Sequence, residues 1–253
     1  MVRIGLLGCG NISGIIARHK IGIEITSFFD AAPAKVDAMK GLLEHARAHY
    51  DFDHFIRDEF EILVEAASVG AVVQYGESAL QSGKDLVALS VGAFADRGFR
   101  NRLEVLAGSL GRKIRIPSGA LFGLDNLKIG QVFALDRLVL RTTKHPAAFG
   151  LQTQERTLLF EGSAEECIKH YPRNVNVAVA LSLAAERPVS VQLWADPAVT
   201  RNIHEIHVAG AFGETTIAIH NLPSPDNPST SYLAALSIIT LLKNLDRPLV
   251  VGT

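Results

Sequence analysis

Cysteine and long apolar runs are both scarce in this sequence, and each scarcity argues against a class of protein. The two cysteines, Cys9 and Cys167, lie far apart, which suits a reducing compartment better than a disulfide scaffold. Because they lack a metal-like spacing, no metal site is expected. No segment reaches the roughly 18 consecutive apolar residues of a membrane-spanning helix. We therefore expect a cytoplasmic protein with no membrane partner.

An excess of charge of one sign is also missing. The sequence has 25 Lys and Arg against 26 Asp and Glu, which gives a formal net charge of −1 at pH 7. Binding to nucleic acid needs clustered Lys and Arg, so no nucleic-acid partner is expected. The 253 residues, 48% of them hydrophobic, are enough for one large domain or two modest ones with a real core.

The first half of the chain alternates strand-like and helix-like segments. Largely apolar strands separated by helices predict a parallel sheet that is covered on both faces, as in a Rossmann-type α/β domain. The predicted strands cover residues 2–7, 23–29, 62–67, 85–90 and 113–116, and the predicted helices cover residues 11–18, 33–50, 72–81 and 97–110.

From about residue 120 the strands change character. Residues 137–143, 189–194, 203–209 and 214–220 alternate more between polar and apolar side chains, which is typical of strands with one wetter face, and residues 164–170 and 175–185 look helical. We predict an inserted α+β domain over residues 120–227, with residues 1–119 and 228–253 forming the Rossmann-type domain. The tail is predicted as a proline-rich loop, a helix over 232–245 and a strand over 249–251, packed on the first domain.

The stretch G-C-G-N-I-S-G follows the first strand and opens the first helix. Gly8 and Gly10 match the first two glycines of a dinucleotide-binding turn, which permit the tight turn and the close approach of a pyrophosphate. The N–H groups at the start of the helix, at Asn11 and Ile12, would face the phosphates. Ser13 replaces the third glycine, so we expect the helix to pack slightly further from the strand. The alternative is a plain strand-to-helix turn without a ligand.

An acidic residue follows the glycine turn at the distance that is typical of a dinucleotide-binding site. Asp30 ends the second strand, 22 positions after Gly8. A carboxylate there accepts hydrogen bonds from the adenosine ribose and repels a 2′-phosphate. This favours NAD as the cofactor, with NADP as a second possibility.

Two further sequence features concern ligand binding and proton transfer. V-E-A-A-S, with Ala67 and Ser68, and S-V-G-A-F both place small residues at carboxyl ends of strands, where open α/β sheets bind ligands, although tight packing would explain them equally well.

His204 and His207 lie three apart on one predicted strand, so their side chains point to opposite faces. Histidine is the natural proton carrier near neutral pH, but position alone does not select either one.

The chain resembles the NAD(P)-dependent L-aspartate dehydrogenases over nearly its whole length. The resemblance rests on the order and spacing of many phrases, which is more specific than a glycine-rich turn alone. The matching phrases are G-C-G-N-I, V-E-A-A-S, S-V-G-A-F-A-D, I-P-S-G-A-L-F-G-L-D, F-E-G-S-A, Y-P-R-N-V-N-V-A, D-P-A-V-T-R-N-I-H-E-I, G-A-F-G and N-P-S-T-S-Y-L-A-A-L-S.

The resemblance implies a reversible oxidative deamination of L-aspartate to iminoaspartate, which hydrolyses to oxaloacetate and ammonia. In many organisms the imine feeds NAD biosynthesis. The family also implies an inserted substrate domain that often mediates dimerisation, so a homodimer is expected. Two other classes stay open: a related dehydrogenase or reductase acting on another small acid, and a non-catalytic NAD-binding sensor.

Site residues follow from the same phrases. The family's active-site histidine falls on His204, in N-I-H-E-I, and one nucleotide contact falls on Ala120. A second nucleotide contact falls on Asn174 or Asn176, of which we favour Asn174 and place Asn176 with the substrate. The two substrate carboxylates need cationic or hydroxyl partners. The candidates are Lys144, Arg173 and Arg201, with Ser229, Thr230 and Ser231 at the expected start of the last helix.

Overall fold

The computed structural model describes residues 1–19, 22–171 and 175–252, and the chain divides into two compact units. Unit 1 consists of Met1–Pro117 and Ala235–Val250, and unit 2 consists of Ser118–Ala234 and the residues after Val250. The chain therefore crosses between the units after residues 117, 234 and 250, whereas the sequence placed two crossings, after 119 and 227. The second difference arises because residues 227–231 form a strand that pairs within unit 2.

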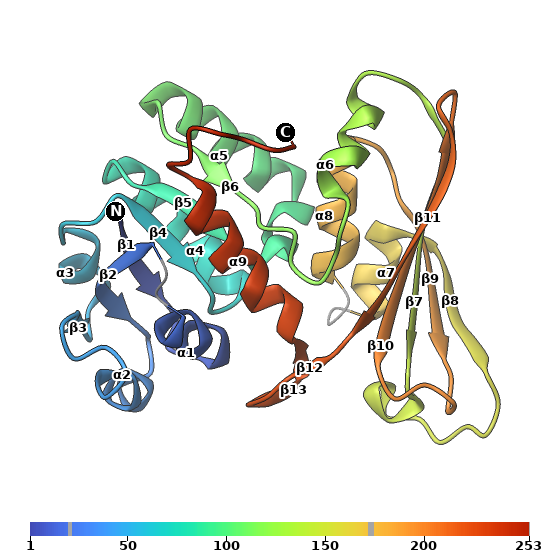
Figure 1. Ribbon diagram of the computed structural model, residues 1–253, viewed down its shortest axis with the longest axis horizontal. Helices are drawn as coiled ribbons and strands as arrows, with labels where there is room; N and C mark the ends of the chain where they lie inside the picture. Colours follow the sequence, from blue (N-terminus) through green and yellow to red (C-terminus); the bar gives the residue numbers. More distant parts are fainter. Residues whose placement is uncertain (20–21, 172–174, 253) are drawn as a thin grey trace. The chain divides into compact units, whose positions relative to one another are not determined.

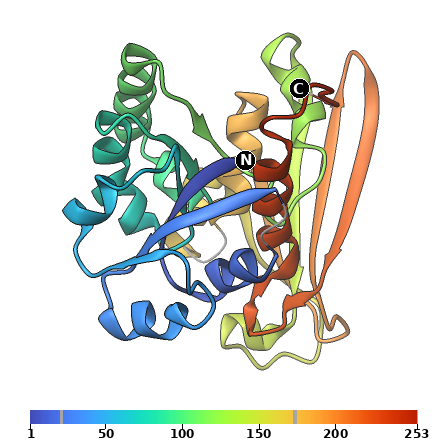
Figure 2. The same cartoon turned by 60° about the vertical axis from the view of Figure 1, so that its left-hand side comes forward.

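Unit 1 contains a six-stranded sheet in the order β3-β2-β1-β4-β5-β6, and all its strand pairs are parallel. Figures 1 and 2 show α4 and α5 on one face of this sheet and α1 and α9 on the other. Its elements are β1 (Val2–Leu7), α1 (Asn11–Arg18), β2 (Ile23–Phe29), α2 (Pro33–Lys40), β3 (Arg47–His49), α3 (Phe52–Ile56), β4 (Ile62–Glu65), α4 (Val69–Gln81), β5 (Asp85–Ala88), the 3-10 helix η1 (Val91–Ala95), α5 (Arg97–Leu110), β6 (Ile114–Arg115) and α9 (Tyr232–Asn244), which begins in unit 2.

The apolar runs of the central strands form the core of unit 1. Ile4 and Leu6 of β1, Phe28 of β2, Leu63 of β4 and Leu86 of β5 are almost completely buried. Because helices cover both faces of the sheet, neither side of these strands needs to be polar. The predicted Rossmann-type sheet is therefore confirmed.

Unit 2 contains a five-stranded mixed sheet in the order β11-β10-β7-β9-β8, in which only the β7–β9 pair is parallel. Figure 1 shows α7 and α8 on one face of this sheet. Its elements are α6 (Leu124–Leu127), the 3-10 helix η2 (Lys128–Gln131), β7 (Leu135–Lys144), the 3-10 helix η3 (Pro146–Phe149), β8 (Thr157–Ser163), α7 (Ala164–His170), α8 (Val175–Ala185), β9 (Ser190–Ala195), β10 (Asn202–Gly210), β11 (Gly213–Asn221), β12 (Pro223–Ser224) and β13 (Asn227–Ser231).

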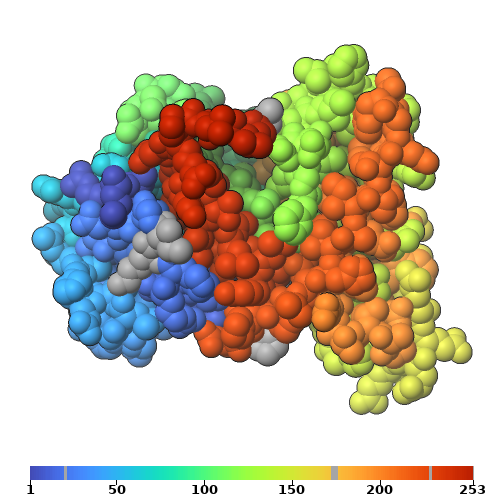
Figure 3. Space-filling model, in the orientation of Figure 1, coloured from blue at the N-terminus to red at the C-terminus, as the bar shows by residue number. Residues whose placement is uncertain are grey.

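Three expected elements are wrong. The helix predicted over residues 33–50 ends at Lys40, and Arg47–His49 instead extend the sheet as β3, beside β2. The predicted loop before the last helix is the β12–β13 hairpin, because its backbone groups pair with each other. Residues 249–251 form no strand; the segment after α9 lies at the surface, where Leu249 and Val250 are exposed (Figure 3).

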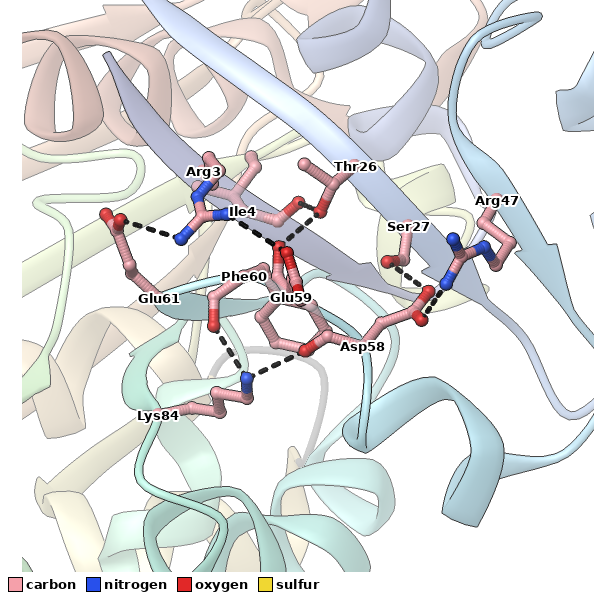
Figure 4. A network of polar contacts seen from close by, with 10 residues as sticks. All are labelled: Arg3, Ile4, Thr26, Ser27, Arg47, Asp58, Glu59, Phe60, Glu61 and Lys84. Atoms are coloured by element: carbon pink, nitrogen blue, oxygen red, sulfur yellow. Dashed lines mark hydrogen bonds and ion pairs between the residues drawn. The ribbon is translucent and has the colours of Figure 1, made fainter.

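A network of polar contacts holds the segment before β4 in place (Figure 4). The Asp58 carboxylate accepts a hydrogen bond from Ser27 Oγ at 2.8 Å and pairs with Arg47 of β3. Lys84 Nζ donates to the backbone oxygens of Asp58 and Phe60 at 2.8 and 2.7 Å. These contacts hold the connection between α3 and β4 in place. Through Arg47 they also join this connection to β3, the edge strand of the sheet.

Candidate functional site

The glycine turn lies at the carboxyl end of β1, and Gly8 is required there for two reasons. Its φ is +101°, a backbone conformation that residues with a side chain rarely adopt. A Cβ at this position would also lie 2.8 Å from Ala67 Cβ and 2.9 Å from the Ala66 oxygen, in the segment after β4. The backbone N–H of Gly8 donates to the Phe29 oxygen at 2.8 Å, which joins the turn to β2.

Ser13 stands at the place of the missing third glycine and has a specific partner. It is completely buried, and its Oγ donates a 2.6 Å hydrogen bond to the Gly8 carbonyl oxygen. The first turn of α1 is thereby joined directly to the glycine turn. Ser13 is larger than the glycine that it replaces, but its hydroxyl gives the buried Gly8 carbonyl group a hydrogen-bond partner.

The start of α1 differs from several other helix starts in unit 1 and unit 2. Helices α3, α4, α5 and α7 have Asp51, Ser68, Asp96 and Ser163 as caps, whose side chains accept hydrogen bonds from first-turn amides. At α1 the cap is Gly10, which has no side chain to do this, and a Cβ there would meet no atom within 4 Å. The start of α1 is therefore a place where a pyrophosphate could approach Gly10 closely and accept from the amides of Asn11 and Ile12.

Asp30 connects the glycine turn to the end of β2. Its Oδ2 accepts from the backbone N–H of Cys9 at 2.9 Å, and its Oδ1 accepts from that of Ala32 at 2.9 Å. Lys35 Nζ lies 3.8 Å from Oδ2. Since each carboxylate oxygen has two lone pairs, Asp30 can still accept from ribose hydroxyls. Burial and the charge of Asp30 raise the pKa of Cys9 to about 12, so its thiol stays protonated and behaves as a small buried hydrophobe.

Glu65, at the end of β4, is a residue that the sequence interpretation missed. It is completely buried and accepts four hydrogen bonds from the segments after β4 and β5. Two of the donors are the backbone amides of Ala67 and Ser68, both candidate cofactor contacts. The signal was visible in the sequence as a charged residue inside the apolar run I-L-V-E-A-A.

His204 lies on β10 in unit 2, on the face that α7 and α8 cover. Its strand places it in line with the buried Ile206 and Val208, and it is itself only 5% exposed. Its Nδ1 lies 2.9 Å from Oγ1 of Thr142, the residue directly opposite on β7. His207 points to the other face, where its Nδ1 lies 3.0 Å from Thr216 Oγ1. The expected opposite orientation of the two histidines is confirmed.

Lys144 follows Thr142 by two positions on β7, so it lies on the same face of the sheet as His204. Burial lowers the pKa of Lys144. Burial and then the positive charge of Lys144 lower the pKa of His204 to about 3. The structure therefore brings together, on one buried face of unit 2, an imidazole that burial and a nearby positive charge keep neutral, a hydroxyl and a lysine side chain.

Asn221 connects two other candidate segments of unit 2. It is buried at the end of β11; its Nδ2 donates to the Ala120 oxygen at 3.1 Å, and its Oδ1 accepts from Ser231 Oγ at 2.6 Å. Thr230 Oγ1 accepts from Asn227 Nδ2 at 3.2 Å. Thr230 and Ser231 end strand β13 and do not start the last helix, which begins at Tyr232.

The remaining candidates have different outcomes. Asn176 is exposed in the first turn of α8, and Arg201 is exposed just before β10. Asn174 and Arg173 lie outside the described residues, as does the side chain of Ser229. In the part of the chain that the structure describes, no group of three or more His, Cys, Asp and Glu residues could hold a metal ion. No described helix is long and apolar enough to cross a membrane.

Two family models match the chain, one in each half. The NAD-binding domain of homoserine dehydrogenase matches residues 5–117, and the C-terminal domain of aspartate dehydrogenase matches residues 125–245. The boundary between the two matches lies close to the crossing from unit 1 to unit 2 after Pro117.

Relatives match the chain over its full length. It is 54% identical over 253 residues to the L-aspartate dehydrogenase of Methanospirillum hungatei JF-1, covering 100% of both chains. It is 41% identical over 250 residues to that of Archaeoglobus fulgidus, covering 98% of this chain and 99% of the relative. Among solved structures, aspartate dehydrogenase from Thermotoga maritima is 30% identical and superimposes with a TM-score of 0.80, covering 100% of both chains.

Proposed function

Since this chain belongs to the L-aspartate dehydrogenase family of oxidoreductases, we propose that it oxidises L-aspartate to iminoaspartate with NAD, reversibly. Hydrolysis of the imine gives oxaloacetate and ammonia, and we propose that the imine feeds NAD biosynthesis. The observation that carries the proposal is the group formed by His204, Thr142 and Lys144 on one buried face of unit 2.

His204 is proposed as the proton acceptor. Oxidation of an amino acid needs a neutral amine, loss of a hydride from Cα and attack of water on the imine. The nicotinamide accepts the hydride when it is bound. Burial and Lys144 lower the pKa of His204 to about 3, which makes the imidazole neutral but a weak base. The two carboxylates of the substrate would offset the charge of Lys144 and favour the charged form of His204, which raises the pKa of His204 from the low value that burial and Lys144 set.

Lys144 is proposed to hold one substrate carboxylate. Burial keeps much of the water away from its ammonium group and lowers its pKa, so Lys144 gains more from an anionic partner than an exposed lysine would. We propose that Asn176 and the hydroxyls of Thr230 and Ser231 add contacts to the substrate, and that Ala120 and Asn174 contact the nucleotide. Asn221 bonds to both Ala120 and Ser231, which supports a position of the substrate contact close to the nucleotide contact.

NAD is proposed as the preferred coenzyme. The carboxylate of Asp30 can bind ribose hydroxyls and repels a 2′-phosphate. NADP is proposed as a second coenzyme, because Lys35 lies 3.8 Å from Asp30 and carries the opposite charge. Gly8, Gly10, Asn11 and Ile12 supply the backbone for the pyrophosphate in either case.

A homodimer is also proposed, with the outer face of the unit 2 sheet as its contact surface. This face lies opposite α7 and α8 (Figure 1). It carries a row of linked polar side chains. Arg141 Nε donates to Gln192 Oε1 at 3.0 Å, and Gln192 Nε2 donates to Glu161 Oε1 at 2.8 Å. Sedimentation analysis of the protein and of a Gln192→Asp variant tests this assignment. The free, buried thiols of Cys9 and Cys167 support a cytoplasmic location.

Turnover in both directions tests the proposed reaction. The protein should reduce NAD in the presence of L-aspartate and oxidise NADH in the presence of oxaloacetate and ammonia. His204→Ala should bind NADH as the wild type does but lose turnover, whereas His207→Ala, on the other face of β10, should keep it. Turnover of another small acid but not of aspartate would favour a related dehydrogenase. NADH binding without turnover of either kind would favour a sensor.

A further inference from the structure

We propose that Glu65 is a positioning residue for nucleotide binding, because it holds the segments that follow β4 and β5 in their places beside the glycine turn. The inference rests on the proposed use of a nicotinamide coenzyme. Glu65 is the last residue of β4 and lies between Leu7 of β1 and Ala88 of β5 in the sheet. It is completely buried, which is rare for a glutamate without a specific set of partners.

Its two carboxylate oxygens accept four hydrogen bonds from two loops. Oε1 accepts from the backbone amides of Ala67 and Ser68, at 2.7 and 2.9 Å, and from Ser90 Oγ at 2.8 Å. Oε2 accepts from the backbone amide of Ser90 at 3.0 Å. One side chain thus fixes three backbone amides in two segments that are separate in sequence. Because all four contacts are donors to Glu65, they match the ionised carboxylate.

The hydrogen bonds to Glu65 hold the segment after β4, which lies against the glycine turn. The backbone N–H of Ala66 donates to the Leu7 oxygen at 2.9 Å, so the segment after β4 lies directly along the end of β1. Ala66 and Ala67 then occupy the space in which a Cβ of Gly8 would lie, at 2.9 and 2.8 Å. A displacement of Ala67 would therefore change the surroundings of Gly8, the residue on which the phosphate turn is built.

Burial opposes the charge that these bonds require. Desolvation raises the pKa of Glu65, and the hydrogen bonds from Ser90, Ala67 and Ser68 offset this only in part, so its pKa stays above the ordinary value for a glutamate. Removing a donor therefore leaves a buried carboxylate less well satisfied, and removing the carboxylate leaves buried amides without their acceptor. Both changes loosen the same two segments.

A graded set of variants tests this role. Glu65→Gln keeps the shape and can retain the acceptor at the Oε1 position, but it turns an N–H group toward the Ser90 amide. Ser90→Ala removes only the hydroxyl donor. Glu61→Gln is the matched control, because Glu61 is exposed just before the same strand and pairs with Arg3. Each protein is titrated with NADH by its fluorescence, and thermal unfolding without nucleotide identifies variants that have not folded.

Glu65→Gln should raise the Kd for NADH about tenfold, because part of the binding free energy is then used to order the loosened segments. Ser90→Ala should raise it by a smaller factor, and Glu61→Gln should leave it unchanged. In turnover, the KM for NAD should rise more than kcat falls. Hydrogen exchange should accelerate at the Ser90 amide of Glu65→Gln more than at those of Ala67 and Ser68.

Two results would overturn the inference in different ways. If folded Glu65→Gln and Ser90→Ala both bind NADH with the wild-type Kd, Glu65 does not position the nucleotide site, although the proposed function stands. If the wild-type protein itself does not bind NAD or NADH, the proposed function fails and the inference fails with it.

Discussion

His204 should make the stability of unit 2 depend on pH, and replacing it with Asn should remove that dependence. Burial and Lys144 lower the pKa of His204 to about 3, whereas a histidine in an unfolded chain titrates near 6.5. Between these values the unfolded chain binds a proton that the folded protein does not. Stability therefore falls as the pH falls from about 7 toward 3. Asn at this position can still form a hydrogen bond with Thr142 but binds no proton in this range.

The size of the effect follows from the two pKa values. Each pH unit between them changes the free energy of unfolding by about 1.4 kcal/mol per proton. Between pH 7 and pH 5 the wild type should lose about 2 kcal/mol relative to His204→Asn, because the unfolded histidine is half protonated near pH 6.5. Any folded pKa below about 4 gives the same difference, since the folded imidazole is then still neutral at pH 5.

The single tryptophan makes the measurement specific to unit 2. Trp194 lies on β9, in the same sheet as His204, so its fluorescence follows the unfolding of this unit in urea. The wild type and His204→Asn are compared at pH 7, 6 and 5. Thr142→Val serves as the control: it removes the partner of Nδ1 and lowers stability, but it should keep the wild-type pH dependence. If the free energies of unfolding of the wild type and of His204→Asn change in parallel with pH, His204 is not a neutral, buried histidine.

Three further changes test the nucleotide site. Ser13→Ala removes a buried hydrogen bond to the Gly8 oxygen and should lower the free energy of unfolding by about 1 kcal/mol, measured in urea, with Ser109→Ala, whose hydroxyl is exposed, as the control. Gly10→Ala should leave the stability of the nucleotide-free protein nearly unchanged, because a Cβ there meets no atom within 4 Å, yet weaken NADH binding; an unchanged Kd would remove Gly10 from the phosphate site. Asp30→Ser should raise kcat/KM with NADP relative to NAD, and an unchanged ratio would remove Asp30 from the ribose site.

The nucleotide half of the fold could be predicted because its signals are local in sequence. Val2–Leu7, the glycines and Asp30 carry spacing that reflects the strand–turn–helix geometry directly. Where the interpretation was wrong, a tertiary contact decided the outcome. Residues 47–49 joined the sheet edge as β3, where Arg47 pairs with Asp58, a contact that helix-like local sequence does not reveal. The hydrogen bond of Ser13 was likewise invisible, since only the size of its side chain could be judged.

The charge state of the site in unit 2 could not be predicted for a different physical reason. Sequence placed His204 on a strand and opposite in face to His207, because strand periodicity is local. Its partner Thr142 is 62 positions away and is brought opposite only by the antiparallel register of β7 and β10. Lys144 then follows on the same face, and the burial of both groups sets their protonation. Since pKa depends on desolvation and on charges across strands, the family resemblance could point to His204 as a candidate proton carrier, but the sequence could not predict that burial keeps its imidazole neutral.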